Sequence, residues 1–275
     1  MSILDKINNR LKQVESIVND PSPLPTPAHR QVGIDLGTAD IVLTVVNEKG
    51  MPTAVFMEWA EVVRDGIVLD FYGATQIVKR LVEKAEQKLS VKIERAVTSY
   101  PPGTDPQISK NVIESAGLEV QAVIDEPSSV IALLGISDGA VVDIGGGTTG
   151  ISIVRDGKIV YTADEPTGGR HATLVIAGNR GISYEEAERL KTNGSAENVM
   201  PIIRPVFQKM ADIAREHLAG KNIAALYLSG GSSCFKGIDT IFREELDDME
   251  IIVPYNPLYL TPLAIASYKN NEELQ

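Results

Sequence analysis

The sequence predicts an α/β protein made of two related lobes, each with a mixed sheet covered by helices. The main observation is a repeat: VGIDLGT at 32–38 recurs as VVDIGGGT at 141–148. Both copies bring a short apolar strand to an aspartate and then to a glycine turn that ends in threonine. Each continues into an alternating strand, at 41–46 and at 151–154. The order strand, turn, helix, strand, helix also occurs twice, which indicates an internal duplication.

Each expected element follows from the spacing of its apolar residues, with a period of two for strands and about 3.6 for helices. The first lobe is expected over 31–139 and the second over 140–268, with a tail at 269–275. After the first hairpin we expect strands at 53–59, 94–99 and 119–124 and helices at 73–89, 105–116 and 127–134. After the second hairpin we expect a helical insert at about 169–220, strands at 224–228 and 250–253, a helix through 246 and a last helix at 257–268.

The first thirty residues form a separate section. An amphipathic helix is expected over residues 1–19, because apolar residues recur there every three or four positions. They are Leu4, Ile7, Leu11, Val14 and Val18. Four prolines between Pro21 and Pro27 predict an extended linker over 20–30. Because so short a helix is marginal alone in water, it needs an apolar surface to cover. It either packs on its own protein or docks on a partner.

Composition narrows the function classes. The chain has 275 residues, of which 43 % are hydrophobic, and can bury a sizeable core. Its net charge is −11 without a basic cluster, so nucleic acid and anionic membranes are poor partners. The apolar runs are shorter than the roughly 20 residues of a membrane helix, and the N-terminus lacks a signal-peptide pattern. The single cysteine, Cys234, fits a reducing compartment and is expected to fill apolar space at a helix start. We expect a cytoplasmic protein.

The two turns have the chemistry of a phosphate site. A glycine turn exposes backbone N–H groups that bind anionic oxygens, and Thr38, Thr148 and Thr149 add hydroxyl groups. Asp35 and Asp143 would repel a phosphate, unless a hydrated Mg²⁺ lies between them and the phosphate oxygens. Two such turns that face each other can hold a polyphosphate. The sequence therefore predicts that the chain binds ATP with Mg²⁺.

Two other phosphate motifs are excluded. Residues 145–150 formally satisfy GxGxxG, but that motif needs a helix directly after the turn, whereas an alternating strand follows here. No GxxxxGK[ST] sequence occurs, so a P-loop is absent.

The ordered motifs resemble the actin/DnaK-type ATPase superfamily, which includes the sugar kinases. They are DLGT at 35–38, DEP at 125–127, DIGGGT at 143–148, LSGGS at 228–232 and the stretch 256–266. Residues 64–70 are also similar to a segment of the bacterial actin-like shape proteins. The resemblance implies an actin-like fold, with two ribonuclease-H-like lobes around a nucleotide cleft.

The resemblance also implies roles for individual residues. Asp35 and Asp143 would hold Mg²⁺, and Glu126 would orient the attacking water. The full nucleotide-binding set would be Asp35, Gly37, Thr38, Ala39, Asp143, Gly145, Gly146, Gly147, Thr148, Thr149, Gly168, Gly169, Glu188, Lys191, Gly230, Gly231 and Ser232. Where relatives carry an acid after the second turn this chain has Gly150, and no lysine matches the phosphate-contacting lysine of DnaK-type chaperones. The resemblance therefore implies weak ATPase activity with slow hydrolysis.

Size, the proline linker and the motif spellings are similar to the ethanolamine-utilization J family. This resemblance implies a chaperone-like factor for ethanolamine ammonia-lyase or for assembly of a bacterial microcompartment. Residues 1–19 would then contact the lyase or the compartment shell. Two other functions stay open: a nucleotide-dependent actin-like scaffold or polymer with little hydrolysis, and a small-molecule kinase of the same fold.

Overall fold

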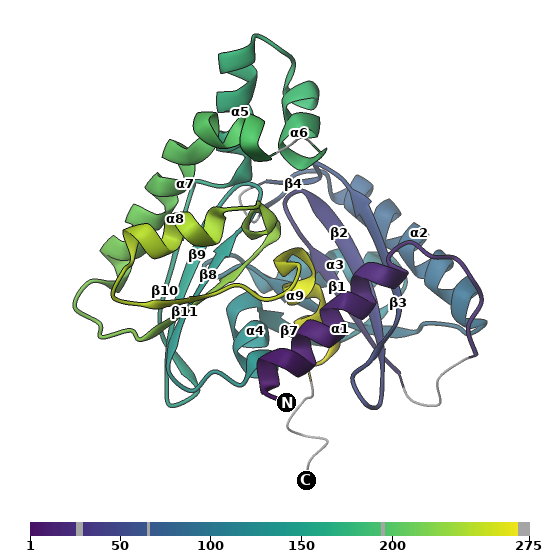
Figure 1. The fold of residues 1–275 in the computed structure, drawn as a ribbon. Coiled ribbons are helices and arrows are strands. Elements are labelled where there is room, and N and C mark those ends of the chain that lie inside the picture. Colours follow the sequence, from purple (N-terminus) through teal and green to yellow (C-terminus); the bar gives the residue numbers. More distant parts are fainter. Residues whose placement is uncertain (26–29, 65–66, 194–195, 269–275) are drawn as a thin grey trace. The chain divides into compact units, whose positions relative to one another are not determined.

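Two sheets organise the chain, each within its own lobe (Figure 1). The structure is a computed structural model that describes residues 1–25, 30–64, 67–193 and 196–268. Lobe 1 comprises Met1–Gly135 and Tyr259–Gln275, and lobe 2 comprises Ile136–Leu258. Each lobe is described by itself below.

The sheet of lobe 1 has the strand order β3-β2-β1-β6-β7 among the described residues. Its strands are β1 (Arg30–Leu36), β2 (Asp40–Asn47), β3 (Pro52–Trp59), β6 (Arg95–Tyr100) and β7 (Glu119–Asp125). Strands β1, β2 and β3 pair antiparallel, whereas β6 pairs parallel with both β1 and β7. The inner residues of β2 are all buried, because helices cover both faces of the sheet.

Helices of lobe 1 lie on the two faces of this sheet (Figure 1). They are α1 (Ile3–Ile17), α2 (Phe71–Leu89), α3 (Pro106–Ser115), α4 (Glu126–Leu134) and α9 (Leu260–Ala266). Val32 and Ile34 point into the core formed with α2 and α3. The alternate residue, Gly33, faces α9, where an added Cβ would lie 2.6 Å from Cα of Ala266. Asp35, two residues on, points to the same face as Gly33.

Helix α1 packs on its own lobe. Ser2 and Asp5 cap its start, and Ile7, Leu11 and Val14 are buried where α1 meets β3 and α4. The chain then adds to the edge of β3, since Val18 forms a parallel bridge with Val55. Of the two alternatives for this helix, the structure shows the first: the apolar stripe is covered by lobe 1 itself.

The start of the linker is held by a buried lysine. Lys88 is 1 % exposed, and its Nζ donates to the backbone oxygen of Asp20 at 2.8 Å and to Oδ2 of the same residue at 2.9 Å. Hydrogen bonds from Ser22 and from Lys88 lower the pKa of Asp20 to about 2. Residues 26–29 of the expected linker lie outside the described residues.

In the segment expected to be similar to the shape proteins, 64–70, the described residues include parts of two short strands. Strands β4 (Val63–Arg64) and β5 (Ile67–Val68) pair antiparallel, and residues 65–66 lie outside the described residues. Asp70 then caps α2, as its Oδ1 accepts the N–H of Gly73 at 2.8 Å.

Lobe 2 repeats the order and directions of the first sheet, as β10-β9-β8-β11-β12 among the described residues. Its strands are β8 (Gly139–Ile144), β9 (Thr149–Arg155), β10 (Lys158–Glu165), β11 (Ala225–Ser229) and β12 (Glu250–Ile252). The first three pair antiparallel, and β11 pairs parallel with β8 and β12. The matching topology agrees with the duplication predicted from the sequence.

Helices of lobe 2 bury one continuous core against its sheet. They are α5 (Gly169–Arg180), α6 (Tyr184–Asn193), α7 (Ala196–Leu218) and α8 (Ile238–Glu245), with 3₁₀ turns η1 (Gly231–Cys234) and η2 (Pro257–Tyr259) near the end of the lobe. The expected insert at 169–220 is thus a group of three helices, α5 to α7. Within this core, Ile203, Phe207 and Met210 of α7 are buried.

Two features differ from the expectation. Helix α9, which we expected in the second lobe, belongs to lobe 1, because Gly33 leaves room for it on β1 and every residue of it is buried there. Cys234 is exposed, and its Sγ accepts the N–H of Leu258 at 3.3 Å, so it does not fill apolar space.

Within the described part of the chain, no helix has both the length and the apolar character needed to cross a bilayer. The tail at 269–275 lies outside that part.

Candidate functional site

In lobe 1, the predicted acids lie at the carboxyl ends of two parallel strands, β1 and β7, which have β6 between them. Asp35 is near the end of β1 and only 8 % exposed, and its Oδ1 accepts a hydrogen bond from Oγ of Ser99 on β6 at 3.3 Å. Glu126 directly follows β7 as the first residue of α4. Because β1, β6 and β7 run parallel, their carboxyl ends meet at one edge of the sheet. The edge therefore carries both Asp35 and Glu126.

The turn between β1 and β2 lies at this same edge. Gly37, Thr38 and Ala39 are all partly exposed there. A Cβ at Gly37 would lie 2.9 Å from the backbone oxygen of Asp40, so a larger residue would open the turn. The structure thus places all the predicted residues of lobe 1 at the same edge of the sheet.

In lobe 2, Asp143 occupies the position on β8 that corresponds to Asp35 on β1. Its Oδ2 accepts a hydrogen bond from Oγ of Ser229 on β11 at 2.7 Å. The glycine turn follows, and it closes on itself through the N–H of Gly145, which donates to the backbone oxygen of Thr148 at 3.0 Å. The two lobes therefore present an aspartate and a glycine turn in the same local arrangement.

The other glycines of the predicted set pack on this turn. The N–H of Gly169 donates to the backbone oxygen of Gly145 at 3.0 Å, and so does Oγ of Ser232 at 2.9 Å. A Cβ at Gly168 would lie 2.8 Å from the backbone oxygens of Gly145 and Gly146. Only a residue without a side chain allows this approach. The turn, the start of α5 and η1 thus form one cluster in lobe 2.

Glu188 and Lys191 of α6 join this cluster. Their side chains form an ion pair of 2.8 Å. Nζ of Lys191 also donates to Oγ1 of Thr173 at 2.9 Å and to the backbone oxygen of Gly169 at 3.2 Å. The hydroxyl of Thr173 in turn contacts Glu188. The pair therefore ties α6 to the first turn of α5 and is more than an isolated surface ion pair.

One predicted phosphate ligand has a different partner in the structure. Thr149 is fully buried, and its Oγ1 donates to the backbone oxygen of Thr167 at 2.6 Å. Its hydroxyl proton thus connects β9 to the loop before α5. The sequence could not show this, because it does not reveal which face of β9 carries Thr149.

A carboxylate lies beside the glycine that replaces the acid of relatives. Gly150 on β9 pairs with Asp143 on β8 and with Asp164 on β10. A Cβ at Gly150 would lie 3.8 Å from Oδ1 of Asp164 and 3.9 Å from Cβ of Asp143. Residues opposite one another on neighbouring strands share a face of the sheet. Asp164 therefore brings an acid to this face from β10. This strand lies outside the motif in which relatives carry their acid.

Sequence reasoning also missed Ser99 and Ser229, the hydrogen-bond donors to the two aspartates. A signal was available: Ser99 ends the strand expected at 94–99, and Ser229 directly follows the strand expected at 224–228. Its partner could not be identified without the register of β1 with β6 and of β8 with β11.

The described residues contain no group of three or more His, Cys, Asp or Glu that could ligate a metal. A Mg²⁺ that keeps most of its waters needs only one or two carboxylates. Asp35 and Asp143 have the chemistry for such a role, because each is a carboxylate beside a glycine turn and accepts a hydrogen bond from a serine.

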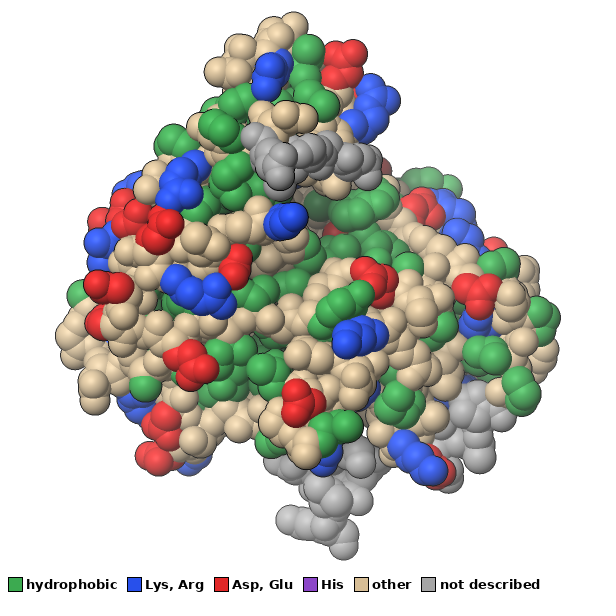
Figure 2. Space-filling model, in the orientation of Figure 1, with side chains coloured by type: hydrophobic (Ala, Val, Ile, Leu, Met, Phe, Trp, Pro, Cys, Tyr) green, Lys and Arg blue, Asp and Glu red, His purple; other side chains and the backbone are tan. Residues whose placement is uncertain are grey.

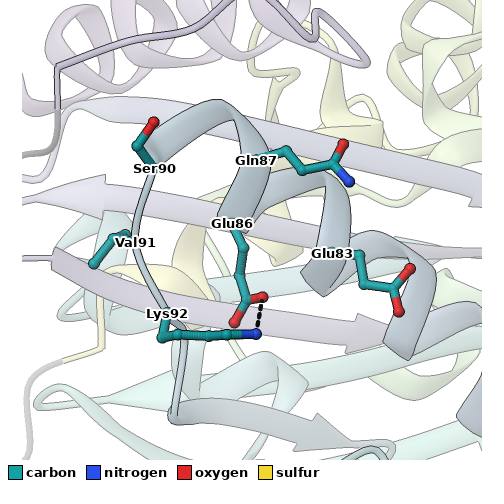
Figure 3. A pocket seen from close by; sticks show the side chains of 6 residues that line it. All are labelled: Glu83, Glu86, Gln87, Ser90, Val91 and Lys92. Carbon is teal, nitrogen blue, oxygen red and sulfur yellow. Dashed lines mark hydrogen bonds and ion pairs between the residues drawn. The ribbon is translucent and has the colours of Figure 1, made fainter.

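Two surface pockets of lobe 1 lie away from this edge. One of about 490 Å³ is lined by Glu83, Glu86, Gln87, Ser90, Val91 and Lys92 (Figure 3). The other, of about 180 Å³, includes Arg30 and Arg95, which begin β1 and β6. Between them Lys92 pairs with Glu86 at 2.8 Å, and this hydrogen bond raises the pKa of Lys92. On the face shown in Figure 2, basic and acidic side chains are interspersed.

Substitution of Gly230 should test the cluster in lobe 2. Gly230 has φ +84°, and a Cβ there would lie 2.5 Å from Oδ1 of Asp143 and from the backbone oxygen of Ile144. Gly230→Ala is therefore expected to destabilise lobe 2 by about 1–3 kcal/mol, through backbone strain and displacement of the Asp143 carboxylate. Chemical denaturation measures this change.

The matched control is Gly178→Ala in α5, where an added Cβ meets nothing within 4 Å. This change should leave the protein as stable or stabilise it by about 0.5–1 kcal/mol, because alanine favours a helix. Equal stability of the two variants would contradict the proposed packing around Asp143.

Comparisons with known proteins extend these observations. The family model "Cell division protein FtsA" matches residues 140–264, and "MreB/Mbl protein" matches residues 51–185. The chain is 50 % identical over 258 residues to the ethanolamine utilization protein EutJ of Escherichia coli K12, covering 94 % of this chain and 92 % of the relative.

Solved structures agree with this relation. The crystal structure of EutJ from Carboxydothermus hydrogenoformans is similar with a TM-score of 0.90 and 42 % identity, over 95 % of this chain and 98 % of that one. MreB5 of Spiroplasma citri bound to AMPPNP has a TM-score of 0.66 and 18 % identity, over 86 % of this chain and 95 % of that one. The second likeness concerns the fold alone. The chain therefore has the actin-like ATPase fold that its motifs predicted.

Proposed function

Because the chain belongs to the ethanolamine utilization protein EutJ family, we propose that it binds Mg-ATP and acts as a slow, nucleotide-dependent chaperone-like factor in ethanolamine utilization. The observation that carries the proposal is the matched pair of aspartates, Asp35 and Asp143. Each is fixed by a serine at the end of a parallel strand and is followed by a glycine turn. A single aspartate–glycine turn is common in proteins, but two in equivalent positions of duplicated sheets favour a shared ligand.

The proposal gives each group a role that its surroundings permit. Asp35 and Asp143 hold Mg²⁺ through its waters, and the turns at 37–39 and 145–148 offer N–H and hydroxyl groups to the phosphates. When bound, Mg²⁺ neutralises phosphate charge. Glu126 accepts a hydrogen bond from the attacking water and orients it. Glu188 and Lys191, beside Gly169, contact the nucleoside.

Asp164 supports a role in Mg²⁺ binding for this face of lobe 2. The face carries two carboxylates, Asp143 and Asp164, across a glycine that places no side chain between them. Hydrolysis is nevertheless expected to be slow, because the chain lacks the phosphate-contacting lysine described above. Turnover well below the roughly 10 s⁻¹ of a median enzyme is the expected result.

The names of the relatives suggest that the client is a protein of ethanolamine utilization. We propose that this client is ethanolamine ammonia-lyase or a component of the assembling microcompartment in the cytoplasm. Residues 1–19 can contribute to such a contact only through the exposed face of α1. Its apolar stripe, which includes Leu11, is already buried against lobe 1. The exposed face of α1 is polar apart from Ile3 at its start, so the proposed contact at this helix is mainly polar.

A second candidate function is a nucleotide-dependent scaffold, which the FtsA and MreB/Mbl matches favour. Light scattering of the full chain separates the two. Scattering that rises with protein concentration on addition of Mg-ATP supports the scaffold, whereas an unchanged signal supports the chaperone-like factor.

Calorimetric titration of ATP and ADP, each with Mg²⁺ and with EDTA, tests the proposed function. We expect both nucleotides to bind in Mg²⁺ and about 10–100-fold more weakly in EDTA, because the aspartates then face the phosphates without a cation. Absence of nucleotide binding in Mg²⁺ would refute the proposal. Turnover that responds to an added small acceptor would instead indicate a kinase.

A further inference from the structure

In both lobes, a buried serine of the neighbouring strand donates a hydrogen bond to the aspartate. Ser99 on β6 donates to Asp35 on β1, at 3.3 Å, and Ser229 on β11 donates to Asp143 on β8, at 2.7 Å. In both lobes the donor lies on the strand that pairs parallel with the aspartate's own strand. The serines are 1 % and 0 % exposed, so water does not compete for their hydroxyl groups.

We propose that Ser99 and Ser229 are matched positioning residues, which orient the two carboxylates toward the waters of the Mg²⁺ that accompanies the nucleotide. This inference rests on the proposed function. A serine hydroxyl donates one proton and so engages one carboxylate oxygen, whereas a carboxylate has about four acceptor sites. Each aspartate therefore keeps acceptor sites for metal-bound water while its rotation is restricted.

Other hydroxyl groups near these two serines donate to backbone oxygens instead of to a carboxylate. Thr98, next to Ser99, donates to the backbone oxygen of Ile34 at 2.9 Å, and Ser233 donates to the backbone oxygen of Ser229 at 2.6 Å. Those bonds join elements of the fold. The hydroxyl groups of Ser99 and Ser229 instead donate to a carboxylate at the candidate site, and they do so in both lobes.

In lobe 2 a second feature restricts the same carboxylate. Gly230, which follows Ser229, approaches Oδ1 of Asp143 so closely that a Cβ would lie 2.5 Å from it. The two oxygens of Asp143 thus face different neighbours, Oδ2 the serine hydroxyl and Oδ1 a glycine backbone. Removal of the hydroxyl would take away this restraint on the carboxylate without changing its charge.

The test compares Ser99→Ala, Ser229→Ala and the double variant with the wild-type chain by calorimetry, with ATP in Mg²⁺ and with ATP in EDTA. Hydrogen-bonded supports of metal ligands typically change metal affinity 10–100-fold when removed. We expect each single variant to bind Mg-ATP about tenfold more weakly and the double variant about a hundredfold, while the affinity measured in EDTA stays unchanged.

The chain offers two matched controls. Ser152 on β9 is 1 % exposed and Thr44 on β2 is fully buried, and neither hydroxyl has a hydrogen-bond partner among the described residues. Ser152→Ala and Thr44→Val should therefore leave both affinities unchanged. Ser99→Cys and Ser229→Cys replace a strong hydrogen-bond donor by a weak one at similar volume. These variants are measured in the same way if a serine-to-alanine change impairs folding.

The outcomes separate this inference from the function on which it rests. A wild-type protein that binds no Mg-ATP refutes the proposed function. A wild-type protein that binds Mg-ATP, with alanine or cysteine variants of equal affinity, overturns the role of the serines alone. An equal loss in Mg²⁺ and in EDTA also overturns it, because the serines would then support the fold and not the metal.

Discussion

Asp35→Ala and Asp143→Ala are expected to lower the affinity for Mg-ATP about 10–100-fold, whereas Glu126→Ala should bind Mg-ATP as the wild type does and turn it over about 10²–10⁴-fold more slowly. The two aspartates lie beside the phosphate turns and in the proposal hold the cation. Glu126 begins α4 and in the proposal acts only on the attacking water. Calorimetry measures the affinities, and phosphate release measures the turnover.

Asp138→Ala is the matched control in lobe 2. This aspartate is exposed and lies in the turn before β8, where it accepts a hydrogen bond from Ser137 at 2.9 Å. Its removal takes away the same charge as Asp143→Ala and should leave affinity and turnover unchanged. If all three proposed residues gave the same affinity as this control, the assignment of Asp35 and Asp143 to the cation would be wrong.

Leu11→Ala is expected to reduce the free energy of unfolding of lobe 1 by about 2–5 kcal/mol. Leu11 is fully buried in the apolar stripe of α1, and a truncated leucine leaves a cavity that the surrounding lobe fills only partly. Ile3→Ala in the same helix serves as the control, because Ile3 is 53 % exposed and its truncation should cost only about 0.5 kcal/mol. Chemical denaturation of the two variants gives the comparison.

Deletion of residues 1–19 extends this test to the edge of the sheet. Without the Val18 bridge and the amide of Asn19, which bonds both the N–H and the oxygen of Met57, strand β3 would present an open edge. We expect lower stability and a tendency to self-associate, as open edges pair with other strands. Wild-type stability of both the deletion and Leu11→Ala would show that α1 is dispensable to lobe 1 and available to a partner.

The sequence predicted most of the fold because its signals are local. The repeat around Asp35 and Asp143, the alternating strands and the periodic helices each depend on residues a few positions apart. What it did not predict depends on pairs far apart in the chain. The contact of Lys88 with Asp20 and the packing of α9 on Gly33 are of this kind. No local period reports such contacts.

The candidate site shows the same division. Ordered motifs indicated Asp35, Asp143 and the glycine turns, and the structure brings these together within each lobe. The place of Asp164 beside Gly150 follows from the register of β9 with β10, which a sequence does not display. Thr149 was given a phosphate role from its neighbours in the motif, but its side chain points into the lobe.

The single thiol of the chain gives experimenters a defined place for a probe. Cys234 is exposed in η1, two residues beyond Ser232, whose hydroxyl bonds to the turn that follows Asp143. A maleimide dye would label this one position without any engineered substitution. Its emission would then follow rearrangement of the turn in real time, so a stopped-flow instrument could record nucleotide association and release on the unmutated protein.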